Sequence, residues 1–129
     1  MGTPAATLGD LITGLCVGHQ TIGPLGVPVP APPIPFSAPI ALGIVPTVLF
    51  VGKPAAVAGA NGLNTPPHVG LHGTDPFLVP TMQQGIVTVG STSVLVGGLP
   101  AVRTGSVSTI CFGLPGTVTG TALTVLIGG

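Results

Sequence analysis

One stretch of this chain reads Gly52-Lys53-Pro54-Ala55-Ala56-Val57-Ala58-Gly59. Two further copies of its pattern, Gly-x-Pro-Ala-(Ala/Val)-x-x-Gly, occupy residues 2–9 and 98–105. We call the copies at 2–9, 52–59 and 98–105 the first, second and third signature copies. Because fixed-period self-similarity indicates a repeated structural unit, three copies predict one closed object with threefold pseudosymmetry.

A short strand pattern precedes each signature copy. Residues 48–52 lead into the second copy, residues 94–98 lead into the third, and residues 125–129 fit the same register. The strand at 125–129 therefore belongs with the first copy, which makes the repeat circularly permuted. We expect this strand to pair with the first copy, so that the two ends lie together and the ring exposes no open edge.

The rest of the chain predicts an all-β architecture. Short runs rich in Val, Ile and Leu alternate with Gly and Pro, which number 22 and 16, and no helical apolar period is present. The length of 129 residues favours a single domain over 1–129 with no appended effector domain. The Pro-rich segment at about 23–46 is expected to be an extended loop excursion from the ring, with a flexible linker as the alternative.

Very few side chains carry charge. They are Asp10, Lys53, Asp75 and Arg103, and the formal net charge is zero. This composition excludes a nucleic-acid partner, which requires many cationic side chains. Prolines interrupt every long apolar window, which argues against a spanning helix. A surface with so little charge is typical of a part that sits on a partner.

All the histidines and cysteines follow a signature copy. Cys16 and His19 follow the first copy, His68 and His72 the second, and Cys111 the third. In a threefold structure these loops converge at one end. Three imidazoles and one thiolate suit tetrahedral zinc, so the predicted ligands are His19, His68, His72 and Cys111, with zinc expected before iron.

The role of Cys16 stays open at this stage. It is either a small buried apolar residue or a replacement for one histidine, and His19, Cys16 and Cys111 form the rival ligand set. With two cysteines and no secretion signal, a structural disulfide is not expected. The alternative to any metal site is that the histidines are scattered through the surface and core.

The signature copies, the strands before them and the His/Cys loops resemble the PAAR-repeat proteins. The motif for which the family is named, Pro-Ala-Ala-Arg, appears here as Pro4-Ala5-Ala6-Thr7, Pro54-Ala55-Ala56-Val57 and Pro100-Ala101-Val102-Arg103. No copy is a full Pro-Ala-Ala-Arg, and the loops are longer than in the shortest members. The resemblance implies a small conical fold of short strands and hairpins, with three His and one Cys holding zinc near the apex.

The resemblance also implies a function. Family members cap and sharpen the trimeric β-helical spike of contractile injection machines, namely type VI secretion systems and extracellular phage-tail-like particles. The expected partner is therefore a homotrimeric β-helical spike protein (VgrG-like) bound through the base. Effector attachment is a further role that the family allows, and a target membrane is contacted transiently during puncture.

This interpretation predicts a structural protein and no enzymatic activity. Because no signal peptide is visible, we expect synthesis in a bacterial cytoplasm, followed by delivery within the particle outside the cell or into a target cell. Two alternatives remain. A small metal-dependent hydrolase would need an open metal position and Asp10 or Asp75, and a membrane-inserting protein would enter lipid as an isolated monomer.

Overall fold

The computed structural model describes residues 2–129, and within that range it contains β-strands and short 3-10 turns but no α-helix. The strands are β1 (Thr3–Ala5), β2 (Leu11–Cys16), β3 (Gln20–Ile22), β4 (Pro28–Pro30), β5 (Ile34–Pro39), β6 (Leu42–Phe50), β7 (Lys53–Leu63), β8 (Gln84–Val89), β9 (Leu95–Val96), β10 (Leu99–Pro100), β11 (Val107–Ile110), β12 (Leu114–Thr119) and β13 (Ala122–Ile127). The 3-10 turns are η1 (Pro24–Gly26), η2 (Pro80–Met82) and η3 (Cys111–Gly113). The predicted all-β architecture is confirmed.

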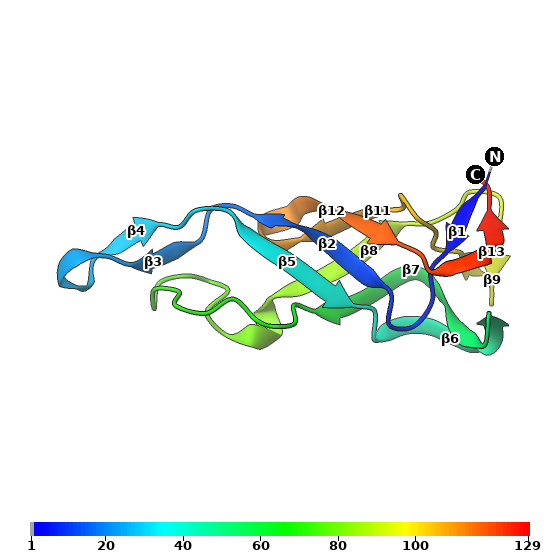
Figure 1. Cartoon of the computed structure of the whole chain (residues 1–129), viewed down its shortest axis with the longest axis horizontal. Helices are drawn as coiled ribbons and strands as arrows, with labels where there is room; N and C mark the ends of the chain where they lie inside the picture. The colour runs from blue at the N-terminus through cyan, green and yellow to red at the C-terminus, as the bar shows by residue number, and fades with distance from the viewer. Residues whose placement is uncertain (1) are drawn as a thin grey trace.

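Seven strands form one antiparallel sheet in the order β5-β2-β12-β11-β8-β7-β6. The sheet curls into a half-barrel along the length of the molecule (Figure 1). Hydrogen bonds link the two sides of the curl near its open seam, from Thr65 N to Ser37 O at 2.8 Å and from Ser37 N to Asn64 Oδ1 at 2.9 Å. The buried side chains of Ile12, Phe36 and Val87 fill the inside of this curl as part of the larger apolar core.

The Pro-rich segment at 23–46 is built into strands at the margins of the structure. Its residues form η1, β4, β5 and the first part of β6, and β5 and β6 are the two edge strands of the main sheet. Proline fits an edge strand because that strand has one side without ladder partners, where the missing N–H is not needed. Pro35 and Pro39 lie in β5 and Pro46 lies in β6.

Each signature copy pairs with the strand that precedes it in the repeat. Phe50 of β6 lies opposite Lys53 in the second copy, and Val96 of β9 lies opposite Leu99 in the third. Ile127 of β13 lies opposite Thr3 in the first copy. The predicted closure of the last strand on the first copy is therefore confirmed, and β1 and β13 lie side by side in Figure 1.

The three signature copies are joined by backbone hydrogen bonds that form a closed cycle. Ala6 N donates to Val102 O at 2.9 Å, Val102 N donates to Ala56 O at 3.0 Å, and Ala56 N donates to Ala6 O at 3.0 Å. All three side chains are fully buried in the larger core. Because three backbones meet at this cycle, only small side chains fit there, which accounts for Ala or Val at this position of the signature.

The last glycine of each signature copy adopts the left-handed backbone conformation. Gly9, Gly59 and Gly105 have φ of 88°, 95° and 88°. L-residues with a Cβ rarely occupy this region, whereas glycine enters it without steric cost. The fixed glycine therefore turns the chain out of the ring at the same point in all three copies.

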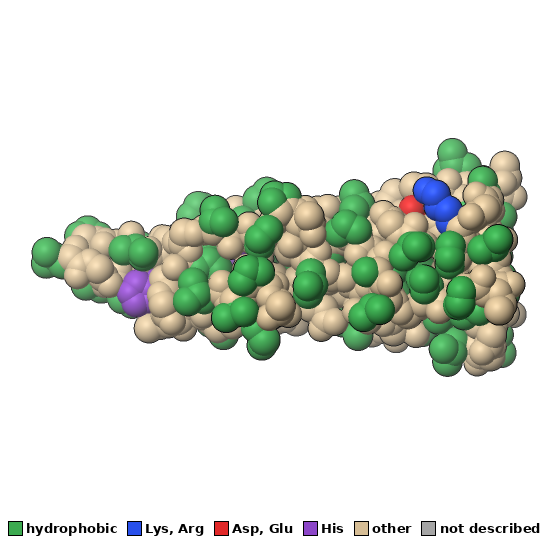
Figure 2. All heavy atoms as spheres, turned by 90° about the horizontal axis from the view of Figure 1, so that it is seen from below, with side chains coloured by type: hydrophobic (Ala, Val, Ile, Leu, Met, Phe, Trp, Pro, Cys, Tyr) green, Lys and Arg blue, Asp and Glu red, His purple; other side chains and the backbone are tan. Residues whose placement is uncertain are grey.

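The molecule narrows from a broad end to a narrow end (Figure 2). The broad end carries β1, β9, β13 and the chain ends, and the narrow end is the hairpin of β3 and β4 (Figure 1). A second, smaller apolar core lies at the broad end and contains Ala5, Ala55 and Ala101, one from each signature copy. The face shown in Figure 2 is largely apolar or uncharged. No helix in residues 2–129 is long and apolar enough to cross a membrane.

Candidate metal centre

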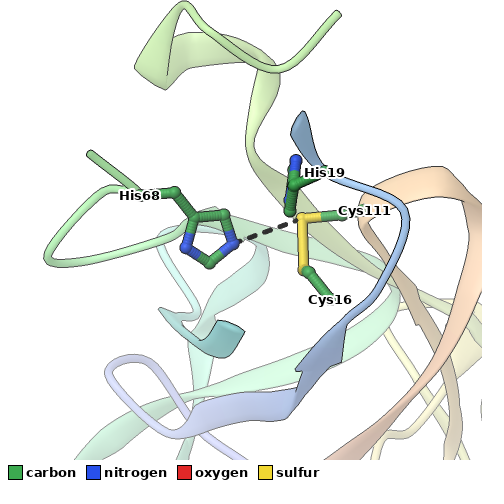
Figure 3. Close-up of side chains that lie close together, drawn as sticks. All are labelled: Cys16, His19, His68 and Cys111. Atoms are coloured by element: carbon green, nitrogen blue, oxygen red, sulfur yellow. Dashed lines mark hydrogen bonds between the residues drawn. A yellow bond between two sulfur atoms is a disulfide. The ribbon is translucent and has the colours of Figure 1, made fainter. Parts of the chain in front are cut away.

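Two cysteines and two histidines meet in the narrower half of the molecule, where the curled sheet gives way to the β3–β4 hairpin. Cys16, His19, His68 and Cys111 are all buried, and each offers one ligand atom that lies within 4.8 Å of the other three (Figure 3). We call these four residues the Cys2His2 cluster. Cys16 ends β2, His19 lies between β2 and β3, His68 lies in the loop after β7, and Cys111 directly follows β11.

The sheet topology explains why these residues converge. Every neighbouring pair in the series β2-β12-β11-β8-β7 is antiparallel, so β2, β11 and β7 all run in the same direction. Each of these strands comes after, or begins in, one signature copy, and each ends toward the narrow end of the molecule. The loops that follow the three copies are thereby brought to one place.

The structure places His19, His68 and Cys111 together, as predicted, and adds Cys16, but it places His72 outside the cluster. His72 is only partly buried, and its Nε2–H donates to Gly26 O at 2.8 Å while its Nδ1 accepts from Thr74 N at 3.1 Å. Its backbone N donates to Gln20 O at 2.8 Å. These bonds tie the loop of His72 to the β3–β4 hairpin and leave neither ring nitrogen for the cluster.

The sulfur atoms of Cys16 and Cys111 are joined as a disulfide in this structure. This corrects the expectation that the chain has no disulfide. The bond forms because β2 and β11 end beside each other, with Cα atoms 5.7 Å apart, which lies within the range that a disulfide spans. Reduction of this bond yields two buried sulfur ligands, and only the reduced pair can serve a metal as thiolates.

His19 is held by a buried carboxylate. Its Nδ1 lies 2.9 Å from Asp75 Oδ2, and that carboxylate also accepts from Gln20 N at 2.9 Å and Phe77 N at 2.8 Å. Because an ionised carboxylate only accepts, the Nδ1 of a neutral His19 carries the proton. The Nε2 atom of His19 is buried and has no hydrogen-bond partner, so its lone pair is the one that can coordinate a metal.

His68 is held by a side-chain amide. Asn64 Nδ2 lies 3.2 Å from His68 Nδ1, and His68 Nε2 lies 3.7 Å from Cys111 Sγ (Figure 3). The Asn64 amide is itself oriented, because its Oδ1 accepts from Ser37 N at 2.9 Å and its Nδ2 donates to Gln83 Oε1 at 3.1 Å. The Nδ1 of His68 is therefore an acceptor, which leaves the proton of a neutral ring on Nε2.

The protonation of the neighbouring groups suits a cation site. Burial and the nearby charge of His19 lower the pKa of the His68 imidazole, against an opposing effect of Asp75. Burial by itself raises the pKa of the Asp75 carboxyl, but hydrogen bonds from Gln20 N, Phe77 N and His19 outweigh it and leave that pKa below its ordinary value. Near neutral pH Asp75 is ionised and His68 is neutral, and the neutral imidazole is the form that binds a metal.

Aromatic rings flank the cluster. The ring centroid of His19 lies 5.0 Å from that of Phe112 and 5.7 Å from that of Phe77, and the two phenylalanine rings lie 4.4 Å apart. These rings shield the imidazole from water. An apolar surrounding shell of this kind limits solvent access to a metal site.

The donor set fits a metal such as zinc. Two sulfur and two nitrogen ligands in a buried position match the Cys2His2 sets of closed structural zinc sites. The unpartnered Nε2 of His19 supports the fit, since a buried nitrogen without a partner is costly unless something occupies it. The buried group of Cys16, His19, His68 and Cys111 could thus hold a zinc ion once the two cysteines are reduced.

Three residues support the cluster without being predicted in that role, namely Asn64, Asp75 and Gln83. The sequence named Asp75 only as a carboxylate of the hydrolase alternative, and its burial beside His19 becomes visible only in the structure. Asn64 and Gln83 carried no signal in the sequence, since their role depends on folding of the loop between β7 and β8.

A scan against protein-family models, a search of curated proteins and a search of solved structures each found no match to this chain.

Proposed function

We propose that this protein is the structural tip of a contractile injection machine, seated on the end of a homotrimeric β-helical spike of the kind implied by its resemblance to PAAR-repeat proteins. The observation that carries the proposal is the closed cycle of hydrogen bonds among Ala6, Ala56 and Val102. A single chain can match a trimer if it presents the same surface three times, and this cycle relates three equivalent segments around one axis.

Several further features repeat around the proposed threefold axis. Gly9, Gly59 and Gly105 share one backbone conformation, as described above. The strands β6, β9 and β13 each pair with one signature copy, and Ala5, Ala55 and Ala101 share the smaller core. These repeats support threefold pseudosymmetry for the broad end, although not for the whole length of the chain.

Three leucines at the broad end mark the proposed docking surface. Leu49, Leu95 and Leu126 lie opposite the signature prolines Pro54, Pro100 and Pro4, in that order. Their exposed fractions are 57%, 62% and 62%. Three large apolar side chains at equivalent positions, each more than half exposed, form a set that one residue on each subunit of a trimer can contact. We call these residues the leucine triad.

The Cys2His2 cluster has a mechanical role in this proposal. Its four side chains come from the segments that follow the three signature copies, so one shared ion would tie those segments together. A narrow end has too little volume for a large apolar core, and structural metals commonly stabilise such regions. A load on the tip is then resisted by coordination bonds as well as by packing.

The arrangement of the carboxylates favours this structural role over a hydrolase. Asp10 is buried and accepts hydrogen bonds from Thr7 N at 2.9 Å and from Thr121 N at 3.0 Å. Asp75 is buried and accepts from Gln20 N, Phe77 N and His19. Thr121 Oγ1 also donates to Asp10 Oδ1, so both oxygens of each carboxylate accept hydrogen bonds that brace turns, which favours a bracing role over activation of a water molecule.

The proposal is tested by binding to a homotrimeric β-helical spike protein. Changing any member of the leucine triad to Asp should weaken binding at least 10-fold, because each places an unpaired charge in an apolar interface. The matched control is Leu42→Asp in the same strand as Leu49, at an exposed fraction of 64% but away from the broad end. If Leu42→Asp weakens spike binding as much as the triad variants do, or if none of these variants weakens it, the leucine triad is not the docking surface.

A further inference from the structure

Given the proposed metal role of the Cys2His2 cluster, the residues that contact its two histidines decide which ring nitrogen of each can coordinate. Asp75 meets only hydrogen-bond donors, namely His19 Nδ1, Gln20 N and Phe77 N. An amide in its place cannot satisfy them, because in either orientation its NH2 group faces an N–H. If that NH2 group faces His19, the ring nitrogen Nδ1 becomes the acceptor and the proton moves to Nε2.

Asn64 has the opposite effect on the second histidine. Its Nδ2 faces an acceptor in Gln83 Oε1 and also faces His68 Nδ1, while its Oδ1 faces the Ser37 N–H. Gln83 cannot turn to relieve this arrangement, because its Oε1 also accepts from His68 N at 2.7 Å. The amide pair therefore fixes the tautomer of His68 with its proton on Nε2, the atom that faces Cys111 Sγ.

We propose that Asp75 is a positioning residue that presents His19 as the preset nitrogen ligand, whereas Asn64 holds His68 in the tautomer that cannot coordinate through Nε2. In the reduced protein, His19, Cys16 and Cys111 would hold zinc first, while His68 Nε2–H donates to the Cys111 thiolate. His68 would complete the Cys2His2 cluster as the fourth ligand when its proton shifts from Nε2 to Nδ1 and the Asn64 amide turns away. The shift moves one proton within the ring and changes no net charge.

This arrangement divides the two histidines by function. His19 coordinates without rearrangement, because its partner already sets the required tautomer. A partner that orients a ligating histidine typically changes metal affinity by about 10- to 100-fold. The hydrogen bond from His68 to the Cys111 sulfur stabilises the thiolate that the site needs.

The test uses the full reduced chain and two readouts, namely zinc affinity by chelator competition and the ring-nitrogen NMR shifts of both histidines without metal. The wild type should show a protonated Nδ1 on His19 and a protonated Nε2 on His68. Asp75→Asn should lower zinc affinity about 10- to 100-fold and should populate a His19 tautomer with its proton on Nε2, because its NH2 group can face His19 Nδ1. Asn64→Asp should raise zinc affinity and move the His68 proton to Nδ1.

Asp10→Asn is the matched control, because it removes the other buried carboxylate of the chain at a site outside the cluster. It should leave both tautomers and zinc affinity unchanged, which separates tautomer control from loss of a buried charge. The proposal is overturned if both wild-type histidines carry the proton on the same nitrogen, a measurement that needs no variant to fold. It is also overturned if zinc binds and Asp75→Asn changes neither the zinc affinity nor the His19 tautomer. If the reduced wild type binds no zinc while the two tautomers are opposite, the proposed metal role itself fails.

Discussion

At the scale of single residues, the signature is explained by backbone crowding and by turn geometry. Its two small residues are buried in two different cores, and its final glycine takes a left-handed conformation. The sequence predicted that these residues turn the chain at a ring. It could not show that the second small residue of each copy, at Ala6, Ala56 and Val102, makes the hydrogen-bond cycle, because that contact joins segments far apart in the chain.

Val51 departs from the pattern of the repeat. It has φ of 53° in the turn between β6 and β7, where the equivalent turn between β9 and β10 has Gly97 with φ of 59°. A β-branched residue in this region is strained by about 1–2 kcal/mol. We expect Val51→Gly to raise the free energy of unfolding by about 1 kcal/mol, measured by chemical denaturation.

The control for Val51→Gly is Val79→Gly. Val79 is similarly exposed but has φ of −79°, which suits any residue. This second change should give no gain, since it only increases the freedom of the unfolded chain. If both variants raise the free energy of unfolding by the same amount, the gain in Val51→Gly does not come from relief of backbone strain at Val51.

Zinc content of single variants distinguishes the residues that bind the metal from His72, which lies outside the Cys2His2 cluster. The reduced wild type should bind one zinc ion per chain, and Cys16→Ser should lower that affinity strongly because it removes one of two thiolates. His72→Ala should retain zinc, because its ring is engaged by Gly26 and Thr74. Elemental analysis after dialysis measures both, and loss of zinc from His72→Ala with retention in Cys16→Ser would contradict the cluster.

His72 shows where sequence reasoning reaches its limit. Its position after the second signature copy is as suitable as that of His68, and no pattern in the sequence distinguishes the two. The difference arises from the loop between them, where Gly70 takes φ of 74° and the chain then pairs with the β3–β4 hairpin. Cys16, by contrast, ends β2 next to the end of β11, where it joins the cluster. The sequence analysis had left open that Cys16 replaces one histidine as a ligand.

At the scale of elements, the hairpins of the repeat explain the position of the chain ends. Two-residue turns connect β6 to β7 at Val51 and Gly52, and β9 to β10 at Gly97 and Gly98, with positive φ at both residues of each turn. Such turns match the twist of paired strands. The third strand pair of the repeat joins β13 to β1, which come from opposite ends of the sequence.

The Pro-rich strands were harder to predict. Proline normally argues against a strand, and the segment at 23–46 therefore favoured a loop. In the structure β5 and β6 form the edges of the sheet, and a sequence does not reveal which strands will be edges. The pairing of 125–129 with the first copy was predictable because the repeat register alone specified it.

If the strand pairs β6–β7, β9–β10 and β13–β1 are equivalent, the chain should tolerate circular permutation at their turns. Joining Gly129 to Gly2 through a short glycine linker and opening the chain between Val51 and Gly52 should give a folded protein, because it exchanges one hairpin turn for another. Circular dichroism and cooperative unfolding measure the outcome. A control opened between Val57 and Ala58, inside β7, should not fold. If the permutant opened between Val51 and Gly52 does not fold while the control forms an intact β-sheet, the three strand pairs are not equivalent.

At the scale of the whole molecule, the two ends have different properties. The broad end combines the signature cycle with the leucine triad, and the narrow end combines the β3–β4 hairpin with the buried Cys2His2 cluster nearby. The low charge of the chain fits a part whose surfaces are covered or cross an apolar layer. The proposed threefold match of one chain to a trimer connects these properties.

The stoichiometry of the complex tests the proposed threefold match. We predict that native mass spectrometry of this protein mixed with a homotrimeric β-helical spike protein shows one copy of this chain per spike trimer. One copy is expected because, in the proposed arrangement, the three signature copies of a single chain face the three subunits of the trimer at once. A complex with three copies per trimer, or no complex with the spike, would contradict the account.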